Sequence, residues 1–174
     1  MSQLDSRTFK VVQTIGIGTK ATDLATGAGG VWVATGNDNT LVRIDPRTGA
    51  VLSTLRLPNE KTQPTTAPAV AVGEGAVWAA SGFRLLKIDP ATGRIVSGLR
   101  RMGCCGGLAD IALGTHSVWI ADLTEVVVRV SPSTGTPTGK PVRGPYPSTL
   151  AVGYGSVWVA GADQARHTSR RLAD

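Results

Sequence analysis

One sequence unit recurs four times along the chain, and this repeat constrains the fold more than any other feature. Each copy has an apolar run, a turn of small residues, and then Val-Trp followed by further apolar and small residues. The copies read TDLATGAGGVWVAT from Thr22, PAVAVGEGAVWAAS from Pro68, ADIALGTHSVWIAD from Ala109 and STLAVGYGSVWVAG from Ser148. Their tryptophans, Trp32, Trp78, Trp119 and Trp158, are separated by 46, 41 and 39 residues, the length of one propeller blade.

A second block follows the tryptophan in three of the copies. It reads LVRIDPRTGAVLSTLRL from Leu41 and LLKIDPATGRIVSGLRR from Leu85, with a weaker copy, VVRVSPSTGTPTGKPVR, from Val127. Asp followed by Pro suits a type I turn, and the Gly three residues after that Pro can adopt the left-handed conformation that starts the next strand. Each unit therefore contains four short apolar runs separated by turns.

Four such runs per unit predict a four-stranded antiparallel blade. In Val31-Trp32-Val33-Ala34 both faces of the strand are apolar, as expected for a blade packed between two neighbours. We therefore expect an all-β fold, a β-propeller of about four blades that forms a partial or incomplete ring. The single repeat domain spans residues 1–174. Its expected parts are an outer strand at 9–17 and blades at about 20–57, 68–100, 108–143 and 148–172, the last one degraded.

The way in which the ring ends is open at this point. Residues 5–15 align with residues 45–55, so 9–17 resembles a fourth, outermost strand whose first three strands are missing upstream. This strand could complete the last blade of a four-bladed ring. Alternatively, the chain is a fragment of a ring of six to eight blades, which is the interpretation favoured here. In a third arrangement, a homodimer closes one eight-bladed ring.

Charge and composition exclude several classes of function. The net charge is +6, but the basic residues are dispersed and the tryptophans lie inside apolar strands, so no nucleic-acid partner is expected. No apolar run is long enough to insert in a membrane, and MSQLDSRTFK lacks the core of a signal peptide. A complete chain would be cytoplasmic, and a fragment of an exported protein extracytoplasmic. The adjacent Cys104 and Cys105 lack the spacing of a metal site and are expected to be reduced thiols.

Candidate binding residues gather on the face that carries the loop before the first strand and the loop between the second and third strands. Asp23 and Asp110 occupy equivalent positions before the innermost strand, where Thr149 takes the same place in the last copy. They could converge at the channel mouth and hold a divalent cation or a basic ligand. The alternative, which we rate higher, is that each caps backbone N–H groups. Asn37, Asn39 and Asp122 complete the expected ligand-binding set, and no catalytic residue, metal ligand or cofactor is predicted.

The segments AVGEGAVW at 71–78 and AVGYGSVW at 151–158, with the turns RIDPRTG at 43–49 and KIDPATG at 87–93, resemble the YVTN/YncE-like propeller repeats of bacteria. More distantly, they resemble the virginiamycin B lyase-like propellers. The second resemblance implies cleavage of a cyclic depsipeptide by a His and a divalent metal. The histidines here are His116 and His167, neither at the expected channel mouth, which disfavours lyase activity.

These features favour a non-catalytic binding or protein-interaction module that acts as a scaffold, expected to be a segment of a larger sensor or regulatory protein. Its partner would be a small molecule or a protein on the loop face. The alternative is a lyase-like or metal-dependent enzyme that acts at the central channel. A purely structural repeat without any ligand is the third hypothesis.

Overall fold

The computed structural model describes residues 1–18, 20–58, 68–100, 107–114, 116–123, 126–143 and 146–161. These residues form sixteen strands and, within the described ranges, no helix. Accordingly, no helical segment of this part of the chain has the length and apolar character needed to cross a membrane. The predicted all-β fold class is confirmed.

Three antiparallel four-stranded sheets follow one another along the chain, each with its strands in sequence order from the inside to the outside. Blade 1 contains β3 (Ala21–Gly27), β4 (Gly30–Thr35), β5 (Thr40–Ile44) and β6 (Val51–Arg56). Blade 2 contains β7 (Ala69–Gly73), β8 (Ala76–Ser81), β9 (Arg84–Ile88) and β10 (Ile95–Arg100). Blade 3 contains β11 (Leu108–Gly114), β12 (Ser117–Asp122), β13 (Val126–Val130) and β14 (Val142–Arg143).

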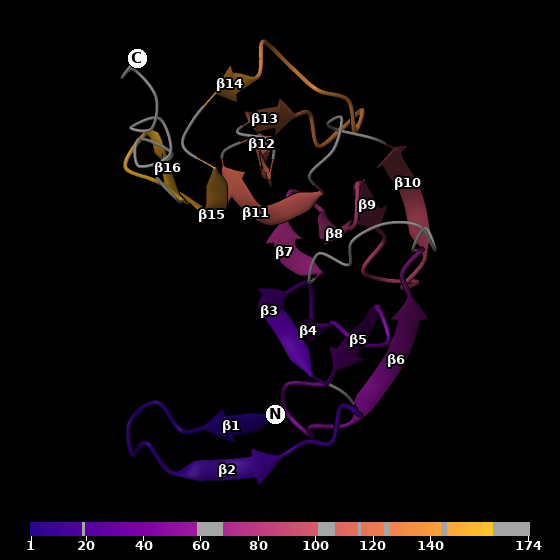
Figure 1. Ribbon diagram of the computed structural model, residues 1–174. Helices are drawn as coiled ribbons and strands as arrows, with labels where there is room; N and C mark the ends of the chain where they lie inside the picture. Colours follow the sequence, from indigo (N-terminus) through magenta and orange to yellow (C-terminus); the bar gives the residue numbers. More distant parts are fainter. Residues whose placement is uncertain are drawn as a thin grey trace, which may run out of the picture.

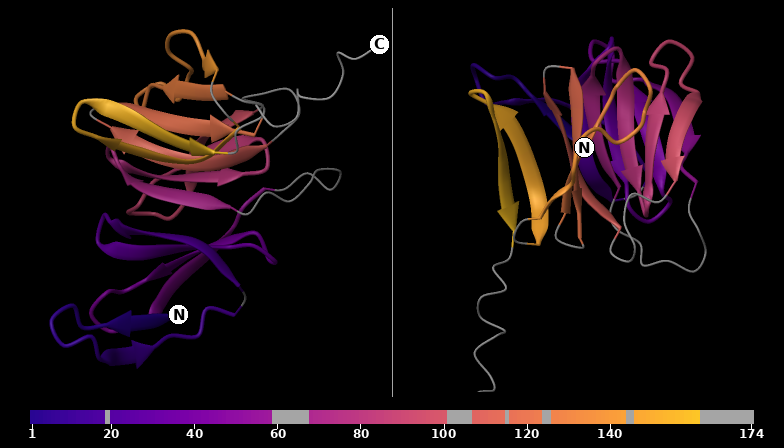
Figure 2. Two further views of the ribbon diagram at one scale, coloured as in Figure 1. Left: turned by 60° about the vertical axis from the view of Figure 1, so that its left-hand side comes forward. Right: turned by 90° about the horizontal axis from the view of Figure 1, so that it is seen from above.

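Two-stranded sheets flank the three blades. The N-terminal hairpin pairs β1 (Ser2–Leu4) with β2 (Val11–Thr14), and the C-terminal hairpin pairs β15 (Pro147–Gly153) with β16 (Ser156–Gly161). The sheets follow an open arc with the N-terminal hairpin at one end and the C-terminal hairpin at the other (Figure 1). The innermost strands β3, β7, β11 and β15 contact one another in succession along the inside of this arc. Figure 2 shows the sheets face to face, as propeller blades pack.

The turn between the third and fourth strands has the predicted chemistry. In blade 1 the carboxylate of Asp45 accepts hydrogen bonds from the backbone N–H groups of Arg47 at 2.7 Å and Thr48 at 3.3 Å. Gly49 follows with φ of +71°, in the left-handed region that a residue without Cβ adopts at little cost. Blade 2 repeats the arrangement at Asp89, whose carboxylate binds the backbone N–H two residues on at 2.7 Å.

The N-terminal hairpin contains the same turn, which corrects one expectation. Asp5 accepts hydrogen bonds from the backbone N–H groups of Arg7 at 2.9 Å and Thr8 at 2.8 Å, and Phe9 takes the left-handed place of the glycine with φ of +56°. Therefore β1 and β2 correspond to the third and fourth strands of a blade. The sequence predicted only the fourth strand here, because the segment at residues 1–4 is too short and too polar to indicate a strand.

The core lies between the sheets, and Trp32, Trp78 and Trp119 each face the sheet that follows. Trp32 and Ala34 pack with Val70 and Val77 of blade 2, whereas Val33 on the opposite face packs with the N-terminal hairpin. The predicted two-sided burial of these strands is thus confirmed. Burial decreases along the chain, since Trp32 and Trp78 are 1% exposed, Trp119 is half-buried and Trp158 is 60% exposed.

A cation on the third strand of each complete blade covers the tryptophan of that blade and, in blades 1 and 2, also bonds to the next blade. The Arg43 guanidinium lies 5.1 Å from the Trp32 ring centroid and donates a 2.8 Å hydrogen bond to the carbonyl oxygen of Pro90. Lys87 repeats this over Trp78, at 5.5 Å, with a bond of 2.7 Å to the next blade. These contacts combine cation–π attraction with a direct tie between blades.

Candidate functional site

Asp23 lies near the start of β3, on the inside of the arc, and both of its carboxylate oxygens accept hydrogen bonds from backbone amides. One oxygen accepts from the N–H of Leu24 at 2.8 Å, and the other accepts from the N–H of Val70 on β7 at 2.7 Å. The side chain therefore caps its own strand and also ties blade 1 to blade 2. The capping role expected from the sequence is present, and the tie between blades is an addition that only the fold reveals.

Asp110, at the same position in blade 3, makes the equivalent connection to the C-terminal hairpin. Its Oδ1 accepts from the N–H of Ile111 at 2.8 Å, and its Oδ2 accepts from the N–H of Leu150 at 2.6 Å. The hydroxyl of Thr149 donates to the same Oδ2 at 2.8 Å. Among the predicted site residues, Asp110 and Thr149 are thus in direct contact, and they connect blade 3 to the C-terminal hairpin.

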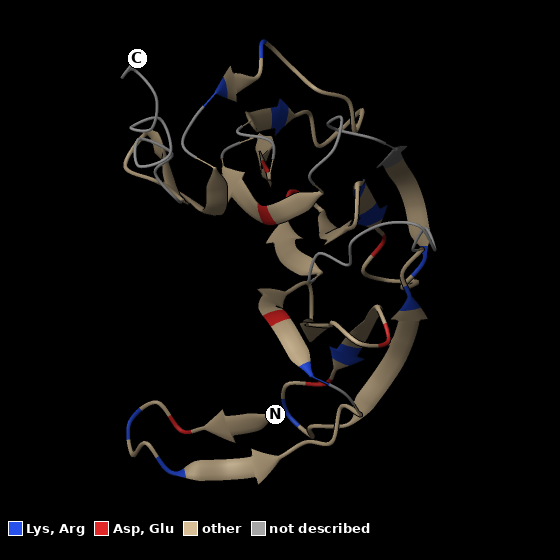
Figure 3. Cartoon of the chain, viewed as in Figure 1, with Lys and Arg blue, Asp and Glu red and all other residues tan. Residues whose placement is uncertain are grey.

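The two carboxylates are not adjacent in the arc. Ala69 occupies the equivalent position on β7, the innermost strand that lies between β3 and β11. Figure 3 shows the acidic positions on β3 and β11, with no acidic position on β7 between them. Within the described ranges, no three His, Cys, Asp or Glu side chains gather in a group that could hold a metal ion. What the two carboxylates do chemically here is to fix backbone amides on neighbouring strands.

The remaining predicted residues have separate positions. Asn39, with φ of +51°, donates from its side-chain amide to the carbonyl oxygen of Leu57 at 2.9 Å and accepts from the hydroxyl of Ser81 at 3.0 Å. Asp122, at the end of β12, is 1% exposed. Asn37 is exposed in the turn between β4 and β5. Of these three, Asn37 therefore has the side chain most accessible to a ligand.

The histidines and cysteines considered in the sequence fall elsewhere. His116 lies in the turn between β11 and β12 with a side chain that is 88% exposed, and its Nδ1 is 3.7 Å from the carboxylate of Glu74. Its backbone N–H donates to the same carboxylate at 3.0 Å. His167, Cys104 and Cys105 lie outside the described residues.

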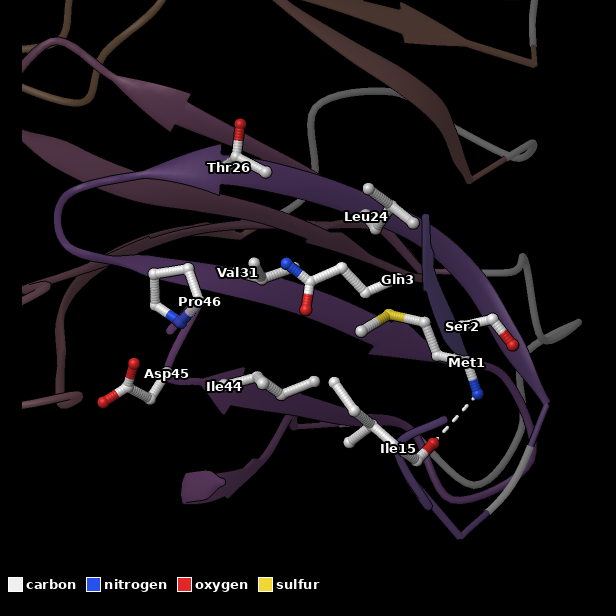
Figure 4. Close-up of a pocket in the computed structure, with 10 residues that line it drawn as sticks. All are labelled: Met1, Ser2, Gln3, Ile15, Leu24, Thr26, Val31, Ile44, Asp45 and Pro46. Atoms are coloured by element: carbon white, nitrogen blue, oxygen red, sulfur yellow. Dashed lines mark hydrogen bonds between the residues drawn. The ribbon is translucent and has the colours of Figure 1, made fainter. Parts of the chain in front are cut away.

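Sequence reasoning missed an apolar pocket between the N-terminal hairpin and blade 1. Its volume is about 340 Å³, and its walls include Met1 and Ile15 from the hairpin side and Leu24, Thr26 and Val31 from blade 1 (Figure 4). The amino group of Met1 donates to the carbonyl oxygen of Ile15 at 2.9 Å and closes one end of the hairpin. The alignment of residues 5–15 with 45–55 was the sequence signal that could have indicated this pocket. An outer pair of strands without its two inner strands leaves a space beside the neighbouring blade.

Of the comparisons with known proteins, the one with solved structures bears on the fold. No protein-family model matches the chain, and no curated protein matches it. Among solved structures, the WD40 domain of Neurospora crassa Pan2 is similar with a TM-score of 0.67 at 13% identity, over 82% of this chain and 44% of that one. BamB from Moraxella catarrhalis is similar with a TM-score of 0.67 at 18% identity, over 88% and 50%.

A third similar structure is shorter. The computationally designed Ika4 protein has a TM-score of 0.66 at 16% identity, over 86% of this chain and 96% of that one. The chain spans about half the length of Pan2 and BamB as solved. The chain therefore has the β-propeller repeat fold, and its described residues form a partial propeller.

Proposed function

We propose that this chain is a non-catalytic binding or protein-interaction module that works within a larger propeller, as part of a sensor or regulatory protein. The observation that carries this proposal is the use of Asp23 and Asp110. Both oxygens of each carboxylate accept backbone amides, so these acids serve to hold blades together. An acid–base or metal mechanism at the channel would need the same oxygens.

The relationship to the bacterial YVTN/YncE-like repeats forms part of this proposal. It is supported by the third-to-fourth strand turns, in which an Asp carboxylate binds two following amides before a left-handed Gly. A blade of this kind supports many functions, so the site has to come from the loops. We place it on the loop face, where Asn37 and Asp38 are exposed between β4 and β5.

A metal titration separates the module from the enzyme alternative. We expect no change in melting temperature on addition of Mg²⁺ or Ca²⁺ to the wild-type chain, and none with Asp23→Ala. A metal-dependent enzyme would instead show a stabilisation that Asp23→Ala removes, since a ligand that binds only the folded state raises its stability. Such a shift would overturn the proposal.

The loop face is tested by affinity capture with matched variants. The double variant Asn37→Ala and Asp38→Ala should lose a partner that the wild-type chain retains, while Leu52→Ala on the outer strand β6 should retain it. Leu52 is a suitable control because it is 52% exposed and lies away from the loop face. Equal capture by all three chains would exclude this face as the binding site.

A further inference from the structure

The two hairpins at the ends of the arc are complementary halves of one blade. The N-terminal hairpin corresponds to strands three and four, as its Asp5 turn shows. Its position agrees, because Gln13 of β2 lies against Gly49 of blade 1 just as Ser53 of β6 lies against Gly93 of blade 2. The C-terminal hairpin corresponds to strands one and two, since β15 and β16 pair in the register of β3 and β4.

Within the described residues, each hairpin lacks the two strands that the other hairpin has. In the described part of the chain β16 pairs only with β15, whereas the second strand of every complete blade also pairs with a third strand. Likewise, β1 pairs only with β2. We propose that two copies of this chain associate so that β15–β16 of each copy joins β1–β2 of the other, completing two split blades and closing one eight-bladed ring.

Trp158 is the anchor of this association, and the pocket of Figure 4 is its receptor. In the intact junction between blades 1 and 2, Trp32 packs on Val70 and Val77. The residues equivalent to this valine pair are Leu24 and Val31, and both line the empty pocket beside the N-terminal hairpin. Its volume of about 340 Å³ is within the range that holds drug-sized molecules, so it has room for an indole.

The exposed fractions of Leu24 and Trp158 both indicate that Trp158 of a second copy fills the pocket. Leu24 is 53% exposed, although its counterparts Val70, Ile111 and Leu150 are each 8% exposed or less. Trp158 is 60% exposed, although Trp32 and Trp78 are 1% exposed. A large aromatic ring and an apolar pocket left open in one fold, at positions that are buried in every complete junction, are the features of an interface anchor.

The glycine at the end of β15 adds an independent contact. A side chain at Gly27 would collide with Val72 of the next blade, and one at Gly114 would collide with Val152, so these glycines mark close approach between blades. Gly153 holds the same place in the C-terminal hairpin but has nothing within 4 Å of a Cβ position. In the proposed pair it faces Thr26 of the second copy, the counterpart of Val72.

Curvature favours a second copy over closure of the chain on itself. The arc superposes on about half of two longer propellers, Pan2 and BamB, with TM-scores of 0.67. The matched part is 44% of one chain and 50% of the other, so a ring with this curvature has room for about as much chain again. Figure 1 shows the two ends of the arc apart, so self-closure would require the blades to close up into a tighter ring. A second copy supplies the missing strands without a change of curvature.

The first test is the solution mass of the 174-residue chain by light scattering after size exclusion. The proposal requires a discrete species of twice the 18.0 kDa chain mass. A monomer overturns it, whether the arc stays open or closes on itself. An open-ended polymer also overturns it, because the ends would then associate without closing a ring of two.

Two interface variants and a mixing experiment test the mode of association. Trp158→Ala and Leu24→Glu should each raise the dimer Kd by at least about thirty-fold, the loss typical of an interface hot spot. Leu52→Ala is the control and should leave the Kd unchanged. Circular dichroism should show native strand content for both variants, since each residue is more than half exposed in the single chain.

Mixing the two variants distinguishes split blades from any other dimer. In a mixed pair, one interface joins Trp158→Ala to Leu24→Glu, whereas the other keeps both native residues. The mixture should therefore form heterodimers more tightly than either variant forms homodimers. Failure of the mixture to recover association would overturn the head-to-tail arrangement.

Cross-linking tests the register. Trp32 lies opposite Arg43 and Val33 opposite Val42 in blade 1, which places Val159 opposite Ser2 of the second copy. In a background of Cys104→Ser and Cys105→Ser, the double variant Ser2→Cys and Val159→Cys should oxidise to a covalent dimer. A covalent monomer would show self-closure, and no cross-link would show a different register. Either result overturns the proposal.

Discussion

The backbone amide of Leu150 donates to the carboxylate of Asp110 at 2.6 Å, and this hydrogen bond joins the C-terminal hairpin to blade 3. Asp23 forms the matching bond to Val70, 47 residues away, at the junction between blades 1 and 2. A hydrogen bond to a charged acceptor contributes more than a neutral one, on the order of 1.5–3 kcal/mol. These two acids are therefore positioned to control how firmly neighbouring blades hold together.

Replacing Asp110 should loosen one junction selectively. Asp110→Ala removes the acceptor for Leu150 and Thr149, and we expect a local loss of about 1–3 kcal/mol because a buried amide is left unsatisfied. Hydrogen exchange should become faster in β15 and remain unchanged in β7. Asp23→Ala is the matched control and should show the reverse pattern. A uniform change in both strands would contradict the assignment of each acid to one junction.

The cation on the third strand should stabilise the junction to the next blade. Lys87→Met removes both the contact with Trp78 and the 2.7 Å bond to Pro132, for an expected loss of about 1–2 kcal/mol in urea unfolding. Lys87→Arg should restore most of this, since Arg43 makes the same two contacts in blade 1. If the arginine variant is as unstable as the methionine variant, the contacts are not the cause.

A single substitution in the N-terminal hairpin should be stabilising. Phe9 has φ of +56° and is 79% exposed, at a position where blade 1 has Gly49. Phe9→Gly should relieve about 1 kcal/mol of backbone strain while losing little buried surface, and the melting temperature should rise. Gly93→Ala makes the opposite change at φ of +67°, and the melting temperature should fall by a similar amount. A drop in both variants would show that Phe9 has a packing role.

The turn aspartates predict loss of stability in acid. The backbone amide of Arg47 lowers the pKa of Asp45 below its ordinary value of 3.8, and the amide of Ala91 does the same to the pKa of Asp89. Because the folded state binds these protons less readily than the unfolded state, the contribution is present above pH 3.8 and is lost as the pH falls through the lower folded values.

Urea unfolding from about pH 6 to about pH 2 measures this effect. The double variant Asp45→Asn and Asp89→Asn should show a weaker pH dependence over the acidic part of this range. Arg47 also lowers the pKa of Asp45 by its charge, and high salt should weaken only this part of the difference. An unchanged slope would assign the acid sensitivity to other carboxylates.

The blade fold could be predicted because its signals are local. The Val-Trp runs occur four times, and the Asp-Pro-x-Thr-Gly turn occurs twice with a Ser-Pro variant as a third copy. These signals and the glycine turns each act within a few residues. The same alignment identified Asp23 and Asp110 as equivalent. It did not identify their partners, because the amides of Val70 and Leu150 lie 47 and 40 residues away and carry no side-chain signature.

The sequence by itself determined the strand type, the turn chemistry and the direction in which each tryptophan faces, since alternation along a strand follows from backbone geometry. The tertiary structure decided which of these tryptophans is covered. Trp32 and Trp158 both lie in a Val-Trp-Val-Ala run, yet one is 1% and the other 60% exposed. Burial depends on whether another blade lies against the strand, and the curvature of the stacked sheets decides that, which no local pattern encodes.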